Sequence, residues 1–291
     1  MRAAMKNYQI GMYEKAMPEE YALGDMLQCG KEAGYDFFEI SIDRTDKRIE
    51  RLFDCAAIEE IRQQSEETGL PVGSMCLSAL GTYTVGNNDP DIEEKAIRIL
   101  YKAIDFAEKL GLRIVQIPAC DVPKNAEHTK ETDERFIRNL RAGVEYATAH
   151  SVMLGLENME DEYMDNVEKS MRLIREIKSP YFLMYPDSGN ITSASKKYLT
   201  DIRQDMMQSR DYCCAFHMKE TRPNKYGGLF YGEGHVDFQE IMRIAWKDLG
   251  IRRFVMEYWY TGNPEWKKDL VTARELCEEW INQAEKERKP L

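Results

Sequence analysis

Four apolar runs in the second half of the chain each end on a residue with a carboxylate or imidazole side chain. These residues are Glu157, Asp187, His217 and Glu257, and they stand 30, 30 and 40 residues apart. The spacing fits one strand and one helix per repeat, with a polar side chain at the end of each strand. The pattern therefore favours a fold in which the ends of successive strands meet.

The same alternation of strand and helix extends over the rest of the chain. Strands are expected at residues 8–13, 36–41, 71–77, 113–117, 152–157, 181–185, 213–218 and 253–257. Helical spacing of apolar residues predicts helices at 19–33, 54–68, 92–110, 132–149, 167–177, 196–208, 238–249 and 266–285. Gly34, Gly69, Gly111 and Gly250 follow helices directly, in the position where a left-handed residue closes the last turn.

Eight strand–helix units in 291 residues predict an α/β protein that forms a single (β/α)8 TIM barrel over residues 1–291. Most strands are apolar at consecutive positions, as expected when both faces of a sheet are covered. A doubly wound open sheet is the alternative. It is weakened because no GxGxxG turn follows the first strand.

The charge and the cysteines restrict the partners and the compartment. A net charge of −11 argues against a general nucleic-acid binder, which needs a basic surface. The seven cysteines contain no CxxC pair, so we expect free thiols in a reducing compartment. The first six residues lack the apolar core of a signal peptide, and no run approaches the roughly 18 apolar residues of a membrane helix. We therefore predict a cytoplasmic protein without membrane contact.

In a barrel the carboxyl ends of the strands converge on one mouth, so the four polar residues should meet there. One imidazole nitrogen and three carboxylates suit one divalent metal ion, whether Zn²⁺, Mn²⁺, Mg²⁺ or Co²⁺. A single acid at a strand end is commonly a helix N-cap or part of a salt bridge. Four polar residues in succession, each one strand–helix unit apart, instead favour a metal site. A trinuclear zinc site like that of endonuclease IV is disfavoured, since the chain has only four histidines.

One metal with two flanking glutamates predicts proton transfer next to a carbonyl. A metal that chelates the carbonyl and the adjacent hydroxyl of a ketose stabilises an enediolate. Glu157 and Glu257 then serve as the acid/base pair, one on each face of the sugar. An aldose–ketose isomerase needs only one face, so the paired glutamates favour an epimerase.

These residues also resemble a known family. The chain is similar, nearly end to end, to the L-ribulose-5-phosphate/L-xylulose-5-phosphate 3-epimerases (often labelled hexulose-6-phosphate isomerases) of the xylose-isomerase-like barrel superfamily. The resemblance lies in GMYEKA at 11–16, DFFEISID at 36–43, SMCLS at 74–78, YPDSGN at 185–190, HMKET at 217–221 and FYGEG at 230–234, followed by VDF at 236–238. It implies metal ligation by Glu157, Asp187, His217 and Glu257, catalysis by the two glutamates, and a homodimer.

One segment departs from the family. Its members commonly carry a basic His-Arg-Arg type segment after SMCLS, whereas this chain has ALGTY at 79–83. The remaining phosphate candidates are Lys219, Arg222 and Lys225, which follow the seventh strand. Further substrate-binding candidates are Tyr13, Glu39, Ser74, Gln116, Tyr258 and Trp259.

Two alternatives to a sugar-phosphate epimerase stay open at this point. One is an epimerase or isomerase of non-phosphorylated ketoses, which the missing basic segment supports. The other is a non-catalytic sugar-binding protein on the same barrel.

Overall fold

The structure is a computed structural model that describes residues 6–286, so the first five residues of the segment searched for a signal peptide lie outside it. Eight parallel strands form one sheet in the order β6-β5-β4-β3-β2-β1-β8-β7. Each strand pairs with its neighbour in sequence except β6 with β7, and β1 pairs with β8. The strands are β1 (Gln9–Tyr13), β2 (Phe37–Ser41), β3 (Val72–Cys76), β4 (Ile114–Pro118), β5 (Met153–Glu157), β6 (Phe182–Met184), β7 (Phe216–Met218) and β8 (Arg253–Met256). The predicted (β/α)8 barrel is confirmed.

The barrel closes between β6 and β7, and this seam differs from the other strand pairs. It consists of two isolated parallel bridges, Met184 with Cys213 and Asp187 with His217. The His217 amide donates to the Pro186 carbonyl at 2.9 Å, which ties the two strand ends together. The seam therefore places two of the predicted metal ligands opposite each other.

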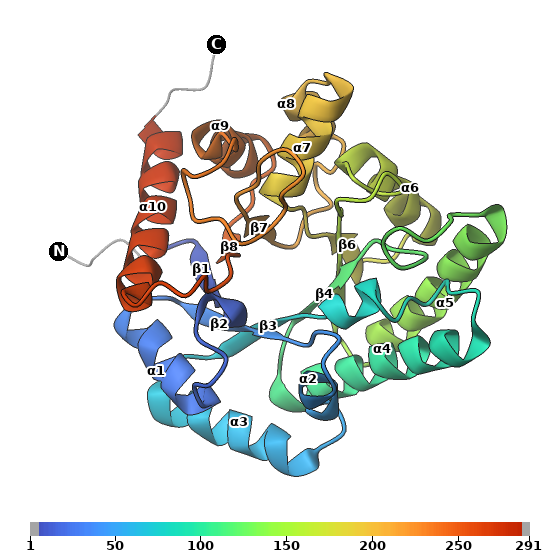
Figure 1. Ribbon diagram of the computed structural model, residues 1–291, viewed down its shortest axis with the longest axis horizontal. Helices are drawn as coiled ribbons and strands as arrows, with labels where there is room; N and C mark the ends of the chain where they lie inside the picture. The colour runs from blue at the N-terminus through green and yellow to red at the C-terminus, as the bar shows by residue number, and fades with distance from the viewer. Residues whose placement is uncertain (1–5, 287–291) are drawn as a thin grey trace.

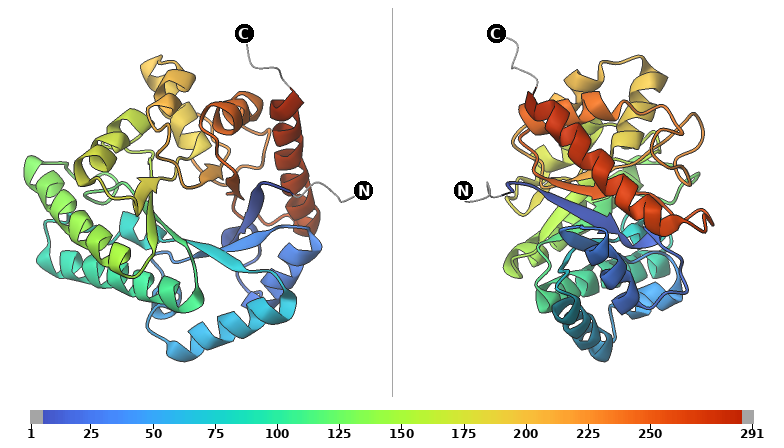
Figure 2. Two further views of the ribbon diagram at one scale, coloured as in Figure 1. Left: turned by 180° about the vertical axis from the view of Figure 1, so that it is seen from behind. Right: turned by 90° about the vertical axis from the view of Figure 1, so that its left-hand side faces the viewer.

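Helices surround the strands as an outer ring (Figure 1), and the side view shows the carboxyl-terminal helix lying across β1 (Figure 2). They are α1 (Leu23–Glu32), α2 (Asp46–Glu50), α3 (Cys55–Thr68), α4 (Pro90–Leu110), α5 (Lys130–Ala149), α6 (Val167–Ile177), α7 (Ser188–Tyr198), α8 (Ile202–Met207), α9 (Phe238–Arg243) and α10 (Trp266–Lys286). Short helical turns η1 (Glu14–Ala16) and η2 (Ser78–Gly81) follow β1 and β3, and η3 (Ile244–Asp248) extends α9 with wider π-type turns. All four predicted helix-ending glycines have positive φ angles.

The helix predicted at 196–208 is wrong. Helix α7 begins directly after Asp187, and a left-handed residue at Leu199, with φ 56°, separates α7 from α8. The first turns of α7 read Ser-Gly-Asn-Ile-Thr-Ser, which are weak helix formers. The tertiary contacts around Asp187 overcome this weak propensity. The predicted helix at 19–33 begins only at Leu23, and α2 was not predicted.

Two apolar layers lie on opposite faces of the barrel. The large one fills the space between the sheet and the helices, and the small one fills the barrel interior. The interior layer contains Tyr13, Phe37, Cys76, Ile114, Tyr185, Ala215 and Val255. Side chains alternate along a strand, so the residue two positions after an interior residue also points inward. His217 follows Ala215 and Glu257 follows Val255, which directs both polar side chains to the top of the interior.

Gly155 occupies the corresponding place below Glu157. A Cβ atom at this position would lie 2.9 Å from the Tyr185 ring. The glycine therefore leaves room for that ring inside the barrel.

Candidate metal centre

The four strand-end residues form one cluster. Glu157 is the last residue of β5, His217 lies in β7, and Asp187 and Glu257 follow β6 and β8. One ligand atom from each lies within 4.8 Å of the others, and all four side chains are buried. The convergence predicted from their spacing is confirmed.

The two ring nitrogens of His217 have different partners. Nε2 lies 2.7 Å from Glu39 Oε1, and Nδ1 lies 2.9 Å from Glu157 Oε1. Glu257 Oε2 is also 2.9 Å from Nδ1, but it makes no hydrogen bond there. Burial disfavours the charged imidazole, yet the Glu257 and Glu39 carboxylates outweigh burial and raise the pKa of His217 well above its usual value. With Nε2–H donating to Glu39, Nδ1 faces the cluster, and loss of the Nδ1 proton would direct its lone pair at a bound cation.

Glu39 lies below the cluster rather than in its open part. Its Oε2 accepts hydrogen bonds from Ser74 Oγ at 2.7 Å and from Tyr185 Oη at 2.8 Å, and Oε1 faces His217. Both Glu39 and Ser74 are fully buried. The arrangement does not support the predicted sugar contacts of these two residues, because their polar atoms are already paired inside the barrel. It suits orientation of the histidine.

Asp187 is both a helix cap and a member of the cluster. Its Oδ1 accepts from the Asn190 amide at 2.7 Å and lies 3.2 Å from Lys219 Nζ. Its Oδ2 is buried without any hydrogen-bond partner. Burial raises the pKa of this carboxyl to about 7, although the Lys219 ammonium acts in the opposite direction. A buried carboxylate oxygen without a partner is costly unless a cation is bound beside it.

The two glutamates have different surroundings. Glu157 Oε2 accepts from Gln116 Nε2 at 2.5 Å, and burial raises the pKa of the Glu157 carboxyl. Burial also acts to raise the pKa of Glu257, but the Lys219 and His217 charges outweigh it and hold this pKa at about 2. The predicted sugar-binding Gln116 thus contacts a glutamate directly.

The donor set fits a divalent metal ion. Three carboxylates and one imidazole nitrogen converge, and the free Oδ2 of Asp187 faces a place where no protein group satisfies it. Mixed nitrogen and oxygen ligands are compatible with Zn²⁺, Mn²⁺, Mg²⁺ or Co²⁺. Glu157, Asp187, His217 and Glu257 are the residues that would hold the ion.

The basic candidates after β7 divide into two groups. Lys219 is buried in the cluster, 3.2 Å from Asp187 Oδ1 and 3.9 Å from Glu257 Oε2. Arg222 and Lys225 are exposed, form a tight turn with each other and do not line the mouth cavity described below. Their predicted contact with a phosphate therefore has no support in this arrangement.

Glu220 joins two of the sequence motifs that carried the family resemblance. Its carboxylate accepts from the backbone amides of Thr221, Gly232, His235 and Val236 at 3.0–3.1 Å. A Cβ atom at Gly234 would lie 2.2 Å from Glu220 Oε1. The segments at 217–221 and 230–236 therefore form one folded loop over the carboxyl ends of β7 and β8. The sequence reasoning missed this role, although an acid directly after the HMK run was a visible signal.

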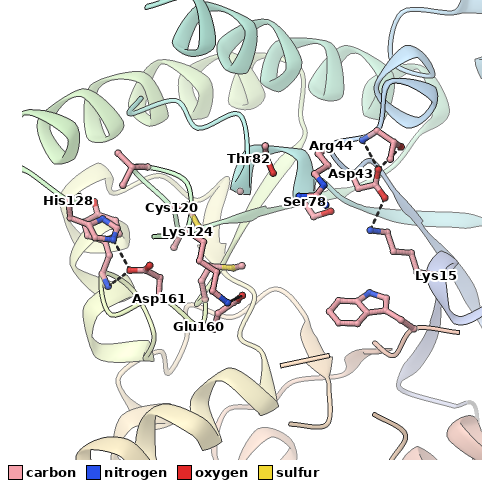
Figure 3. Close-up of a pocket in the computed structure, with 17 residues that line it drawn as sticks. Lys15, Asp43, Arg44, Ser78, Thr82, Cys120, Lys124, His128, Glu160 and Asp161 are labelled. Carbon is pink, nitrogen blue, oxygen red and sulfur yellow. Dashed lines mark hydrogen bonds and ion pairs between the residues drawn. The ribbon is translucent and has the colours of Figure 1, made fainter. Parts of the chain in front are cut away.

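A cavity of about 590 Å³ opens among the loops at the carboxyl ends of the strands (Figure 3), and none of the four cluster residues lines it. Met159 and Trp259, each two residues beyond a glutamate of the cluster, lie in its wall. Tyr13 is instead buried in the interior layer, and the centroid of its ring lies 6.3 Å from the centroid of the His217 ring. Tyr258 lines a separate cavity of about 330 Å³ together with Trp259. Of the three aromatic residues among the predicted substrate-binding candidates, only Trp259 borders the larger cavity.

A family model described as xylose isomerase-like TIM barrel matches residues 27–280. The chain belongs to this family. Within it, the chain is 32% identical over 287 residues to the putative L-ribulose-5-phosphate 3-epimerase SgbU of Escherichia coli K12, which covers 96% of this chain and 99% of that protein. It is 30% identical to the L-ribulose-5-phosphate 3-epimerase UlaE of Escherichia coli O139:H28, over 93% and 94% of the two chains. The predicted resemblance to these epimerases is confirmed.

Solved structures of other proteins share the fold. One of L-ribulose 3-epimerase has a TM-score of 0.78 at 18% identity and covers 97% of this chain and all of its own. One of a D-tagatose 3-epimerase-like protein has a TM-score of 0.77 at 15% identity over 95% and 98% of the two chains. At these identities the likeness concerns the barrel alone.

Proposed function

We propose that the protein is a metal-dependent 3-epimerase that interconverts ketose 5-phosphates of the L-ribulose 5-phosphate and L-xylulose 5-phosphate type. The observation that carries this proposal is the meeting of Glu157 and Glu257 with Asp187 and His217 in one buried cluster. The names of the relatives at 30–32% identity support the reaction and the phosphorylated substrate.

The two glutamates reach the cluster from strands that are not neighbours. Strands β6 and β7 lie between β5 and β8, so the carboxylates approach a bound sugar from different sides. When bound, the divalent metal polarises the ketose carbonyl and lowers the energy of the enediolate. One glutamate removes the C3 proton on one face, and the other delivers a proton to C3 on the opposite face. In the reverse direction the two residues exchange roles.

Neighbouring residues hold the glutamates in place and exclude water. Gln116 donates to Glu157, and the Lys219 ammonium lies beside Glu257. Both carboxylates are about 95% buried, so bulk water has little access to the proton-transfer atoms. The Lys219 ammonium lies between Asp187 and Glu257, where its positive charge would favour negative charge developing on a bound ketose.

Turnover in D₂O tests the reaction. We expect deuterium to appear at C3 of both the product and the recovered substrate, with no exchange at C1. Glu157→Gln and Glu257→Gln should each lower kcat by about 10²–10⁴-fold, because each removes one of the two proton-transfer groups. Glu162→Gln changes an exposed acid outside the cluster and serves as the matched control.

The opposite labelling pattern would contradict the proposal. Exchange at C1 without inversion at C3 indicates an aldose–ketose isomerase. Full activity in both glutamate variants indicates that other residues move the proton.

Three finer features belong to the same proposal. The metal is one of Zn²⁺, Mn²⁺, Mg²⁺ and Co²⁺, and the most active ion after reconstitution of the metal-free protein identifies it. All seven cysteines are unpaired, which supports a cytoplasmic location that fractionation can check. Within residues 6–286 no helix is long and apolar enough to cross a membrane. A homodimer follows from the family resemblance, and light scattering that gives the mass of one chain would contradict it.

A further inference from the structure

The mouth cavity reaches from Met159 and Trp259, each two residues beyond a glutamate of the cluster, to the loops after β2 and β3. Its walls come from the loops that follow β1 to β5 and β8. Figure 3 shows Arg44, Ser78 and Thr82 together on one side, with Lys124, Glu160, Asp161 and His128 across from them. The volume of about 590 Å³ lies within the ~300–1,000 Å³ range of small-ligand sites. A sugar with its reacting carbons at the cluster would extend its distal end into this space.

Most charged groups in the cavity wall neutralise one another. Lys15 pairs with Asp43 at 2.8 Å and Lys124 pairs with Glu160 at 3.0 Å. His128 Nε2 lies 2.7 Å from Asp161. These groups therefore offer little net charge to an anionic ligand.

Arg44 is the exception. Within residues 6–286 its guanidinium has neither an acidic partner nor a hydrogen-bond partner. The next two arginines of the same segment are both satisfied by the buried Glu14, Arg48 at 2.6 Å and Arg51 at 2.7 Å. Of the two exposed cations in this segment, Arg44 and Lys47, only Arg44 lines the cavity.

The backbone around Arg44 is well defined. Asp43 Oδ1 accepts from the Thr45 amide at 2.9 Å and from the Thr45 hydroxyl at 2.6 Å. This turn precedes α2 and presents Arg44 at the cavity wall. The guanidinium is therefore carried by an ordered turn rather than by a long extended loop.

A second group beside Arg44 also lacks a partner. Ser78 Oγ is buried and makes no hydrogen bond, although the residue lines the cavity. Thr82 adds a hydroxyl to the same wall. An unpaired guanidinium next to free hydroxyls matches the donors that a phosphate monoester requires, because arginine can bind two phosphate oxygens at once.

We propose that Arg44, together with Ser78 and Thr82, binds the distal phosphate of the ketose and makes the enzyme selective for sugar phosphates. This inference rests on the proposed 3-epimerase function. It replaces Lys219, Arg222 and Lys225 as the phosphate ligands. It also explains how the chain binds a phosphate with ALGTY at 79–83, since the cation comes from the loop after β2 instead of the loop after β3.

Paired substrates test the inference. The kcat/KM values of the metal-loaded wild-type protein, Arg44→Gln and Arg44→Lys are measured with L-ribulose 5-phosphate and with L-ribulose. We expect Arg44→Gln to lower kcat/KM for the phosphorylated ketose roughly 10–100-fold, mainly through KM, because charge-assisted hydrogen bonds to the phosphate are lost. For the free ketose the change should stay below about threefold, since no phosphate is present. Arg44→Lys keeps the charge but cannot bind two phosphate oxygens at once. Its kcat/KM for the phosphorylated ketose should therefore lie between those of the wild-type protein and Arg44→Gln.

Lys47→Gln is the matched control, because Lys47 is an exposed cation of the same segment that does not line the cavity. It should leave both kcat/KM values unchanged. Inorganic phosphate gives a second readout that does not depend on the sugar. It should inhibit the wild-type protein competitively with the phosphorylated ketose and inhibit Arg44→Gln much more weakly.

The outcomes separate this inference from the proposed function. If Arg44→Gln lowers kcat/KM equally for both ketoses, or for neither, the phosphate site is overturned. C3 epimerisation by the wild-type protein would then still support the proposed function. Absence of C3 epimerisation with both ketoses overturns the proposed function and this inference with it.

Discussion

At the scale of single residues, the proposed metal centre depends on groups beneath the four candidate ligands. Glu39 is fully buried and accepts from Ser74, Tyr185 and His217. A carboxylate behind a ligating histidine fixes the ring orientation and increases its basicity. Glu39 is therefore a positioning residue that acts through His217.

Replacement of Glu39 tests this assignment. We expect Glu39→Gln to weaken metal binding by about 10–100-fold, because the charged acceptor behind His217 is lost. Calorimetric titration of the metal-free protein with Zn²⁺ or Mn²⁺ measures the change. Glu94→Gln, which alters an exposed acid of α4, is the control. A raised KM for the ketose at saturating metal, with unchanged metal affinity, would instead support direct contact between Glu39 and the sugar.

At the scale of elements, the segment after β6 is built around Asp187. The backbone amide of Asp187 donates to Asn158 Oδ1 at 3.0 Å. The backbone amide of Asn190 donates to Asp187 Oδ1 at 2.7 Å. These contacts start α7 at Ser188 despite its weak helix formers. The other end of α7 has an unfavourable residue. Leu199 ends the helix with φ 56° and is 92% exposed.

The backbone at Leu199 gives a stability prediction. A left-handed leucine is strained by its Cβ atom, so Leu199→Gly should raise the free energy of unfolding by roughly 0.5–1 kcal/mol. Lys196→Gly places the same residue three positions earlier, in right-handed helix, and should lower that free energy by about 1 kcal/mol. Urea denaturation of both variants measures the difference. Destabilisation of similar size in both would show that the left-handed strain at Leu199 is unimportant.

At the scale of the whole molecule, the proposed metal centre spans the seam between β6 and β7, where strand pairing is sparsest. Strands β6 and β7 are joined only by isolated bridges, while the other neighbouring strands pair in ladders, with one register shift between β2 and β3. The four proposed ligands come from β5 to β8, so they lie on both sides of this seam. A bound ion would therefore link the two edges where hydrogen bonding is sparse.

Metal removal should then destabilise the seam first. A ligand at 100 times its Kd contributes about 2.7 kcal/mol to the free energy of unfolding, so chelation should lower Tm by several degrees. Hydrogen exchange should accelerate most at residues 182–187 and 213–218. Asp187→Asn should lose this response to metal. Asp201→Asn should keep it, because Asp201 also caps a helix but lies outside the cluster. A uniform change in exchange over the barrel would contradict a local role at the seam.

Much of this molecule follows from local sequence pattern. The alternation of apolar runs and helical stripes predicts eight units, and the end of each strand marks which polar residues reach the mouth. These features are local because side-chain direction alternates along a strand and repeats every 3.6 residues along a helix. Glu157, Asp187, His217 and Glu257 were identifiable on this basis, as was the left-handed glycine after four of the helices.

Other features depend on which charges meet in space. Arg44, Arg48 and Arg51 are alike in sequence, yet Glu14 pairs with the last two and leaves the first at the cavity. Lys219 looked like a phosphate ligand but lies between two carboxylates. Glu39 looked like a sugar contact but is paired beneath His217. The sequence by itself determined the barrel and the convergence of the four strand-end residues, because backbone periodicity directs those side chains. Only the tertiary structure decided which charged groups are neutralised and which remain for a substrate, because each pairing joins residues that are distant along the chain.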